Sequence, residues 1–229
     1  MIVFALAPRT LSAALFLGLA ALVLFAAPHA RAQSPETDTQ SPMPGEATPL
    51  PDIDPGRALS PRVWGDDDAP LTIYDYSALT CGHCADFHLN TLPALKEEFI
   101  ETGKVKLVFR DMPFNEAGVL AHALARCAPK SRYWAMLDLL FGQQRQWVQS
   151  NTRESLKQLA SLAGMDTDTV EACWANRRLE DGVLQTALGG RQKYDVRSTP
   201  TFVFNDGEDR IVGAQDIEAF RDVIGRLAP

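Results

Sequence analysis

The segment TCGHC, residues 80–84, places two cysteines in the chain with a glycine and a histidine between them. Such a CxxC is half of a metal site, an inert disulfide or a redox-active dithiol. A zinc site needs a second pair of ligands near by, and the other two cysteines, Cys127 and Cys173, stand 46 positions apart. An inert bridge over so short a loop stabilises a fold little. We therefore interpret Cys81 and Cys84 as a working dithiol that needs no metal and no cofactor.

The residues around the dithiol predict unequal roles for its two sulfurs. Cys81 follows a predicted strand and opens a predicted helix, where unpaired N–H groups and the helix dipole favour a thiolate. A protonated His83 would add to this effect. Cys84 lies one turn further along the helix, which suits a resolving thiol. We expect Cys81 to be the nucleophile, because the thiolate is the attacking species in disulfide exchange.

Stabilising the thiolate also makes the disulfide a stronger oxidant. One pKa unit is about 1.4 kcal/mol, and this free energy corresponds to roughly 30 mV for a two-electron couple. A strongly reducing and a strongly oxidising protein dithiol differ by on the order of 150 mV. Several pKa units at Cys81 would supply most of that difference, so the residues between the cysteines tune the direction of exchange.

Asp75 is a candidate proton carrier. It lies six residues before Cys81, on the strand face that it shares with Ile73. If that face is buried under the helix, the Asp75 carboxylate can take the proton of Cys84 during exchange. If Asp75 lies at a strand end, it contacts water instead. The sequence leaves both alternatives open.

Thr199 and Pro200 open a later strand, at a position where a cis X-Pro bond can occur. A cis Pro200 would leave a loop with a free backbone edge beside the dithiol. An extended substrate could pair with that edge as an added strand.

The elements that position these residues follow from the hydrophobic pattern. Residues 71–76 (LTIYDY) and 104–111 (KVKLVFRD) have the β-branched and apolar residues of strands. Between them, up to Ile100, apolar residues recur at helical spacing. Pro93 should bend this helix, and Gly103 should end it.

From residue 116 to about 194 the chain has only helical patterns, with four apolar stripes. Asn151 with Glu154, and Asp168 with Glu171, predict capping boxes.

Strands return at residues 199–207 and around Ile211, and a last helix spans about 215–227. The order is therefore βαβ, a helical block at about 114–194, and ββα. This order is typical of an α/β fold in which helices flank a mixed central sheet and the helical block is an insertion.

The N-terminus has the composition of a targeting sequence. Arg9 is followed by an apolar run from Leu11 to Ala27 and by a small-x-small cleavage site ending at Ala32. We predict that residues 1–32 are a secretory signal peptide cleaved after Ala32; an uncleaved leader would be an inner-membrane anchor near the lower length limit. Residues 33–56, rich in proline and polar residues, are a predicted disordered spacer. The folded domain would then span 57–229.

Charge and cysteine count narrow the classes of partner. The chain has 22 basic and 29 acidic residues, and residues 1–32 hold two of the basic ones and no acid, so the mature chain carries a net charge of −9. This balance argues against nucleic acid or an anionic membrane surface as a partner. Four cysteines in an exported protein favour disulfides over metal ligands.

Together these residues resemble the thioredoxin superfamily, and specifically the exported DsbA-like thiol:disulfide oxidoreductases. The similarity runs from residue 57 to the C-terminus and rests on the segments TIYDYSALTCGHCADFH, GKVKLVFRDMP, RSTPTFVFNDG and GAQDIEAF. It implies a thioredoxin fold with an inserted helical subdomain. It also implies that Cys81 is the nucleophile, Cys84 the resolving thiol and Pro200, after Thr199, the cis-proline. Asp75 occupies the place of the family's buried acid.

Gly82 departs from the strongest oxidases of that family, which have proline there. Gly-His is the dipeptide of protein disulfide isomerases, so we predict an oxidant of intermediate strength. The predicted spacer, residues 33–56, is too short and too polar to be the dimerisation domain of periplasmic isomerases. We therefore expect a monomer in which isomerisation is not the main role.

Cys127 and Cys173 both lie on apolar helices of the helical block. The hypothesis is a structural disulfide that pins two of these helices. Two buried free thiols are the alternative, which export to an oxidising compartment disfavours.

These observations predict a periplasmic enzyme that introduces disulfides into cysteine-containing exported proteins. A membrane redox partner, by resemblance a quinone-linked oxidase, would recycle it. In reverse the same residues would make a disulfide reductase or isomerase. The non-enzymatic alternative is a thioredoxin-fold protein that binds copper through the dithiol or peptides through the Pro200 loop.

Overall fold

The computed structural model describes residues 49–227 of the chain. The predicted signal peptide at 1–32, its cleavage after Ala32, and the predicted spacer up to residue 48 lie outside the described residues. Within 49–227, none of the helices combines the length and the apolar character that crossing a membrane requires.

Five strands form one mixed sheet in the order β1-β3-β2-β4-β5. β2 and β3 run parallel, and every other neighbouring pair is antiparallel. The strands are β1 (Arg62–Trp64), β2 (Leu71–Ser77), β3 (Val105–Asp111), β4 (Thr201–Phe204) and β5 (Asp209–Val212). The predicted mixed sheet is confirmed, whereas the short edge strand β1 was not predicted.

The helix after the dithiol is not one regular α-helix. It consists of α2 (Gly82–Asp86), a π-helical segment (Phe87–Thr91), α3 (Leu92–Leu95) and a second π-helical segment (Lys96–Ile100). Pro93 lies in the first turn of α3, where a residue without an N–H group is tolerated. Two π-helical segments flank α3, which the sequence analysis did not predict. Gly103 follows with φ +73°, as expected of a residue that ends a helix.

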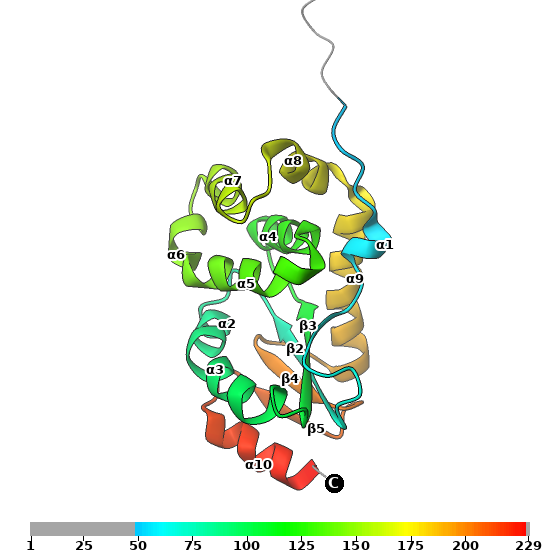
Figure 1. Ribbon diagram of the computed structural model, residues 1–229, viewed down its shortest axis with the longest axis vertical. Coiled ribbons are helices and arrows are strands. Elements are labelled where there is room, and N and C mark those ends of the chain that lie inside the picture. Colours follow the sequence, from blue (N-terminus) through cyan, green and yellow to red (C-terminus); the bar gives the residue numbers. More distant parts are fainter. Residues whose placement is uncertain (1–48, 228–229) are drawn as a thin grey trace, which may run out of the picture. The chain divides into compact units, whose positions relative to one another are not determined.

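The remaining helices lie mostly in the predicted insertion. They are α1 (Pro55–Ala58), α4 (Glu116–Cys127), a 3₁₀ turn (Lys130–Arg132), α5 (Tyr133–Gly142), α6 (Gln144–Trp147), α7 (Thr152–Leu162), α8 (Thr167–Ala175), α9 (Arg177–Tyr194) and α10 (Ile217–Leu227). Figure 1 shows α4 to α8 gathered beyond one end of the sheet, while α10 lies near the other end. The fold is thus the predicted one, a mixed sheet flanked by helices with an inserted helical block.

The two faces of the sheet are covered by different helices. On one face Ile73 and Phe202 pack with Phe87 from the helix of the dithiol and Phe220 from α10. On the other face Tyr76 and Val203 pack with Ala187 of α9. A third apolar cluster fills the helical block and includes Leu79 and Cys84. The segment that carries the dithiol therefore belongs to the core of the insertion as well as to the sheet.

Two predicted details of the helical block are wrong. Asn151 does stand at the N-cap of α7, but its side chain makes no capping hydrogen bond. The cap of α8 is Asp166 and not Asp168, because the Asp166 carboxylate accepts the backbone N–H of Thr169 while Asp168 lies inside the first turn.

The folded part also begins earlier than residue 57. Asp54 caps α1 by accepting the backbone N–H groups of Gly56 and Arg57. Asn176, at the start of α9, donates its side-chain N–H to the carbonyl of Ile53 at 2.8 Å. Residues 53–56, which we assigned to the disordered spacer, are therefore held against the domain by long-range contacts that composition does not reveal.

Candidate active site

Cys81 stands where a strand, a turn and a helix meet. β2 ends at Ser77, a turn follows in which the Cys81 N–H donates to the carbonyl of Ala78 at 3.0 Å, and Cys81 is the N-cap of α2. Its thiol is half-buried, and Sγ lies 3.5 Å from the carbonyl oxygen of Thr199. The first turn of α2 therefore presents free N–H groups to a sulfur that a partner molecule can still reach.

Several groups lower the pKa of Cys81 to about 5. The largest cause is the hydrogen bond from the Cys84 thiol. Burial opposes it, and the Thr199 hydroxyl and the backbone N–H groups of Cys84 and His83 add to it. Cys81 is thus poised as a thiolate at neutral pH, which is the reactive form of cysteine.

His83 acts on this sulfur through its backbone. Its N–H is one of the groups that lower the pKa of Cys81. The imidazole is 78 % exposed, with Nδ1 3.9 Å from Oδ2 of Asp86. The role that we assigned to a protonated His83 side chain stays a prediction.

Cys84 is the buried member of the pair. Its side chain is fully buried in the core of the insertion. Sγ accepts the backbone N–H of Ala78 at 3.4 Å. Burial and the hydrogen bond with Cys81 raise the pKa of Cys84. The pKa values of the two thiols therefore differ strongly: that of the outer Cys81 is lowered and that of the inner Cys84 is raised.

Asp75 is buried inside the sheet and not at a wet strand end. It stands between Phe109 of β3 and Phe202 of β4 in the register of β2, and it is only 2 % exposed. The hydroxyl of Ser77 donates to Oδ1. Burial raises the pKa of Asp75 to about 7, against the opposing effect of Ser77. This carboxyl group can gain or lose a proton near neutral pH, while its exchange with Cys84 stays a prediction.

The Thr199–Pro200 peptide bond is cis. The loop brings Thr199 against both sulfurs: its carbonyl lies next to Cys81, and its hydroxyl lowers the pKa of both cysteines. That hydroxyl is buried and, among the described residues, has no hydrogen-bond partner. It is therefore free to turn towards whichever sulfur carries the charge.

A hollow of about 490 Å³ lies beside the start of α2. It is lined by Gly82, Ala85 and Leu89 on one side and by residues 141–146 of the insertion on the other. Leu89 is 47 % exposed there. The hollow offers apolar and polar surface next to the CxxC segment.

Sequence analysis missed two side chains that bind the loop of the dithiol. Gln144 donates from Nε2 to the carbonyls of Leu79 and Cys81 at 2.8 and 2.9 Å. Nε2 of His122 accepts the N–H of Leu79 at 3.3 Å. The only sequence signal was a histidine on an otherwise apolar helix, which does not identify its partner.

Cys127 and Cys173, the other two cysteines, form a disulfide. It joins the end of α4 to α8, two helices of the insertion. No group of three or more His, Cys, Asp or Glu residues in 49–227 is arranged to hold a metal ion.

Known proteins share the sequence pattern and the fold of this chain. A family model described as thioredoxin matches residues 58–226. The solved structure of alpha-DsbA1 from Wolbachia pipientis is 26 % identical with a TM-score of 0.68, and the match covers 73 % of this chain and 90 % of that one. BdbD from Bacillus subtilis, at 22 % identity and a TM-score of 0.65, shares the fold over 78 % of this chain and 95 % of its own.

Proteins that are similar in sequence also have names that refer to disulfide chemistry. Disulfide bond formation protein D of Bacillus subtilis is 28 % identical over 160 residues, which is 63 % of this chain and 67 % of that protein. A protein of Rickettsia bellii whose name includes "protein-disulfide oxidoreductase" is 26 % identical over 162 residues, or 70 % of this chain. The match covers only 62 % of that relative's length.

Proposed function

The chain belongs to the thioredoxin family and is DsbA-like, and from this premise we propose that it is an exported thiol:disulfide oxidoreductase that introduces disulfides into other proteins. The observation that carries the proposal is the position of Cys81 at the start of α2, where the Cys84 thiol, the Thr199 hydroxyl and two backbone N–H groups lower its pKa to about 5. A leaving group of low pKa departs readily from a mixed disulfide, and a stabilised thiolate favours the reduced form of the enzyme. Both effects drive oxidation of the client.

The reaction begins with a disulfide between Cys81 and Cys84. A client thiolate attacks Sγ of Cys81, the bond between the two cysteines breaks, and Cys84 leaves with the electron pair. The second client thiolate then attacks the client sulfur of the mixed disulfide and releases Cys81 as a thiolate. The client has lost two electrons and gained a disulfide, and the Cys81–Cys84 pair has gained two electrons.

The two sulfurs of the enzyme end the reaction in different protonation states. Cys81 remains ionised, because the Cys84 thiol, the Thr199 hydroxyl and two backbone N–H groups stabilise its charge. Cys84 is buried and takes up a proton when it leaves, since burial raises its pKa. Asp75, whose pKa is about 7, is the proposed source of that proton, and it takes the proton back when the pair is reoxidised.

Clients would be extended chains that carry cysteines. The cis Thr199–Pro200 loop provides an edge for such a chain, and the hollow between α2 and residues 141–146 provides a place for its side chains. The proposed setting is the periplasm, with the protein as a monomer released by cleavage after Ala32. A membrane quinone-linked oxidase is the proposed recycling partner.

Thiol trapping in cells tests the direction of exchange. The Cys81–Cys84 pair should be mostly oxidised, and Cys81→Ser should abolish oxidation of clients. A mostly reduced pair would contradict an oxidase and indicate a reductase or isomerase, for which Gly82 and His83 are typical residues. Full cellular activity of Cys81→Ser would contradict thiol exchange altogether and favour a role in binding copper or peptides.

A further inference from the structure

The peptide groups of Leu79 bind side chains of the helical insertion on both sides. Its N–H donates to Nε2 of His122 from α4, and its carbonyl accepts Nε2 of Gln144 from α6. Leu79 is fully buried and stands two residues before the nucleophile. Because a buried peptide group needs a hydrogen-bond partner, these two contacts fix the orientation of the Leu79 backbone.

Gln144 binds the loop at two points. A side-chain amide has two N–H donors, and Gln144 directs one to the carbonyl of Leu79 and the other to that of Cys81. The carbonyl of Cys81 also accepts the N–H of Ala85 at 3.1 Å, which is the first hydrogen bond of α2. Gln144 therefore holds the same oxygen atom that starts the helix.

His122 is itself held by a buried ionic cluster. Nδ1 lies 2.9 Å from Oδ1 of Asp111, and Nε of Arg126 donates to Oδ2 of Asp111 at 2.8 Å. Since the carboxylate accepts at Nδ1 and the Leu79 N–H donates to Nε2, the imidazole is neutral with its proton on Nδ1. Burial would raise the pKa of Asp111, but Arg126 and the hydrogen bond from His122 outweigh it and lower that pKa. The ring is therefore locked in the tautomer that can accept from Leu79.

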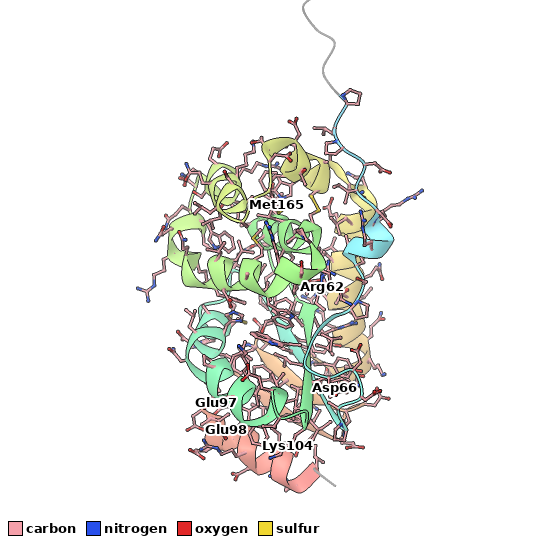
Figure 2. The ribbon with its side chains drawn as sticks, viewed as in Figure 1. Arg62, Asp66, Glu97, Glu98, Lys104 and Met165 are labelled. Atoms are coloured by element: carbon pink, nitrogen blue, oxygen red, sulfur yellow. A yellow bond between two sulfur atoms is a disulfide. The ribbon has the colours of Figure 1, made fainter. Side chains whose placement is uncertain are left out.

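The cluster reaches the edge of the sheet. Arg62 of β1 donates to the carbonyl of Arg126 at 2.9 Å and to that of Ala58 at 3.1 Å. Figure 2 shows Arg62 next to the helical block. Arg126 and His122 thus fix α4 to Asp111 at the end of β3, and Arg62 fixes it to β1, so the position of the ring is held from several sides.

We propose that Gln144 and His122 are positioning residues, which hold the backbone of residues 79–81 so that the N–H groups of His83 and Cys84 point at Sγ of Cys81. The inference rests on the proposed function only in that the thiolate is the reacting species. It assigns to the inserted helices a part in the reactivity of the dithiol, although the hydrogen bonds of both side chains go to backbone groups of the loop and to Asp111 and not to a sulfur. Loss of either contact should leave the fold in place and make Cys81 less acidic.

Gln144→Met provides the test, because methionine keeps the length of the side chain and removes both donors. The readout is the pH profile for alkylation of Cys81 by iodoacetamide in the reduced full-length protein. We expect the rate at pH 4, one unit below the pKa of about 5, to fall by about threefold or more, which corresponds to an apparent pKa raised by about half a unit or more. In a redox titration with glutathione, the midpoint of the Cys81–Cys84 pair should shift to that of a weaker oxidant.

Gln149→Met is the matched control. Gln149 is an exposed glutamine just after α6, and within residues 49–227 its side chain bonds only to the carbonyl of Arg145. Its alkylation profile should equal that of the unmodified protein. If Gln144→Met and Gln149→Met give the same profile and the same midpoint, the inference about Gln144 is wrong.

A second pair of variants tests His122. His122→Gln keeps an acceptor for the N–H of Leu79, whereas His122→Phe keeps a flat ring without one. The profile of His122→Gln should lie closer to that of the unmodified protein; equal profiles would contradict the role of the acceptor. If His122→Phe does not fold, the Gln144 pair decides alone.

Failure of the proposed function would look different. Alkylation is measured without any client protein. If the unmodified protein has an acidic Cys81 and the Gln144 contrast is as expected, but no client is oxidised, then oxidase activity is wrong and the positioning role stands.

Discussion

The carbonyl oxygen of Thr199 lies 3.5 Å from Sγ of Cys81, although 118 residues separate them in the chain. The same residue carries a buried hydroxyl that lowers the pKa of both sulfurs of the dithiol. Thr199 therefore contacts the dithiol from outside the helix of the CxxC. Its two polar groups have opposite preferences: the carbonyl favours the thiol of Cys81, and the hydroxyl favours the thiolate.

Thr199→Val should make Cys81 a weaker acid. Valine keeps the shape of the side chain and removes the hydroxyl, so the thiolate loses one donor. We expect the alkylation rate of Cys81 at pH 4, below its pKa of about 5, to fall by about threefold or more. The free energy of unfolding should change little, because the hydroxyl has no other partner among the described residues. An unchanged alkylation profile would show that this hydroxyl does not act on Cys81.

The reduced protein should gain stability as pH rises from about 5 to about 9. The folded pKa of Cys81 is about 5 against an ordinary value of 9. Stabilisation from the thiolate is then fully present above the unfolded pKa and is lost as pH falls through the folded pKa. For a half-exposed thiol, solvent screening leaves on the order of 2 kcal/mol. Urea unfolding of the reduced protein and of Cys81→Ser should diverge over this range; parallel curves would contradict the prediction.

Asp75→Asn should stabilise the protein above neutral pH. The folded pKa of Asp75 is raised to about 7, so its burial cost grows as pH rises from the unfolded value near 4 to the folded value near 7. The variant should be more stable than the unmodified protein at pH 8 by on the order of 3 kcal/mol, and nearly equal to it at pH 4.

Reoxidation of the Asp75→Asn dithiol should also be slower, since Cys84 loses its proton acceptor. Stopped-flow oxidation with glutathione disulfide measures this. Rates equal to those of the unmodified protein at every pH would mean that water, and not Asp75, handles the proton.

Removing the Cys127–Cys173 disulfide should lower stability and spare the chemistry. The bridge closes a loop with a sequence separation of 46, for which the chain-entropy model gives about 4 kcal/mol. The double variant Cys127→Ala, Cys173→Ala should show this loss in chemical unfolding, while Cys81 keeps its alkylation profile well below the unfolding transition. Mass spectrometry of the non-reduced protein should find the bridged peptide before the comparison is made.

Local patterns predicted most of the sheet and the ends of its strands. β2 and β3 alternate apolar residues, so the sequence places them within one or two residues. β1 was missed because Arg62–Trp64 is too short to show a period and is a strand only through its pairing with β3. Caps such as Asp166 were misplaced by two residues, because any nearby polar side chain fits the motif and only the fold selects one.

The core of the site was predictable for a similar reason. Cys81, Cys84, Thr199 and Pro200 carry signals within a few residues, in the CxxC and the Thr-Pro pair. Gln144 carries no such signal, and a histidine on an apolar helix does not identify the partner of His122, since the partners lie 65 and 43 residues away. Burial of Asp75 depends on three strands that meet only in the folded sheet. The sequence therefore predicted which face of its strand Asp75 occupies, but not how exposed its side chain is.

The anchoring of Leu79 limits what can be transplanted. Moving the five residues of TCGHC onto another scaffold would carry the two cysteines but not α4 and α6. These two helices supply the side chains that bind Leu79 in the turn before Cys81. The smallest portable unit includes those two helices. Protein engineers who exchange only the dipeptide between the cysteines therefore vary one control of reactivity while a second, contributed by remote helices, stays fixed.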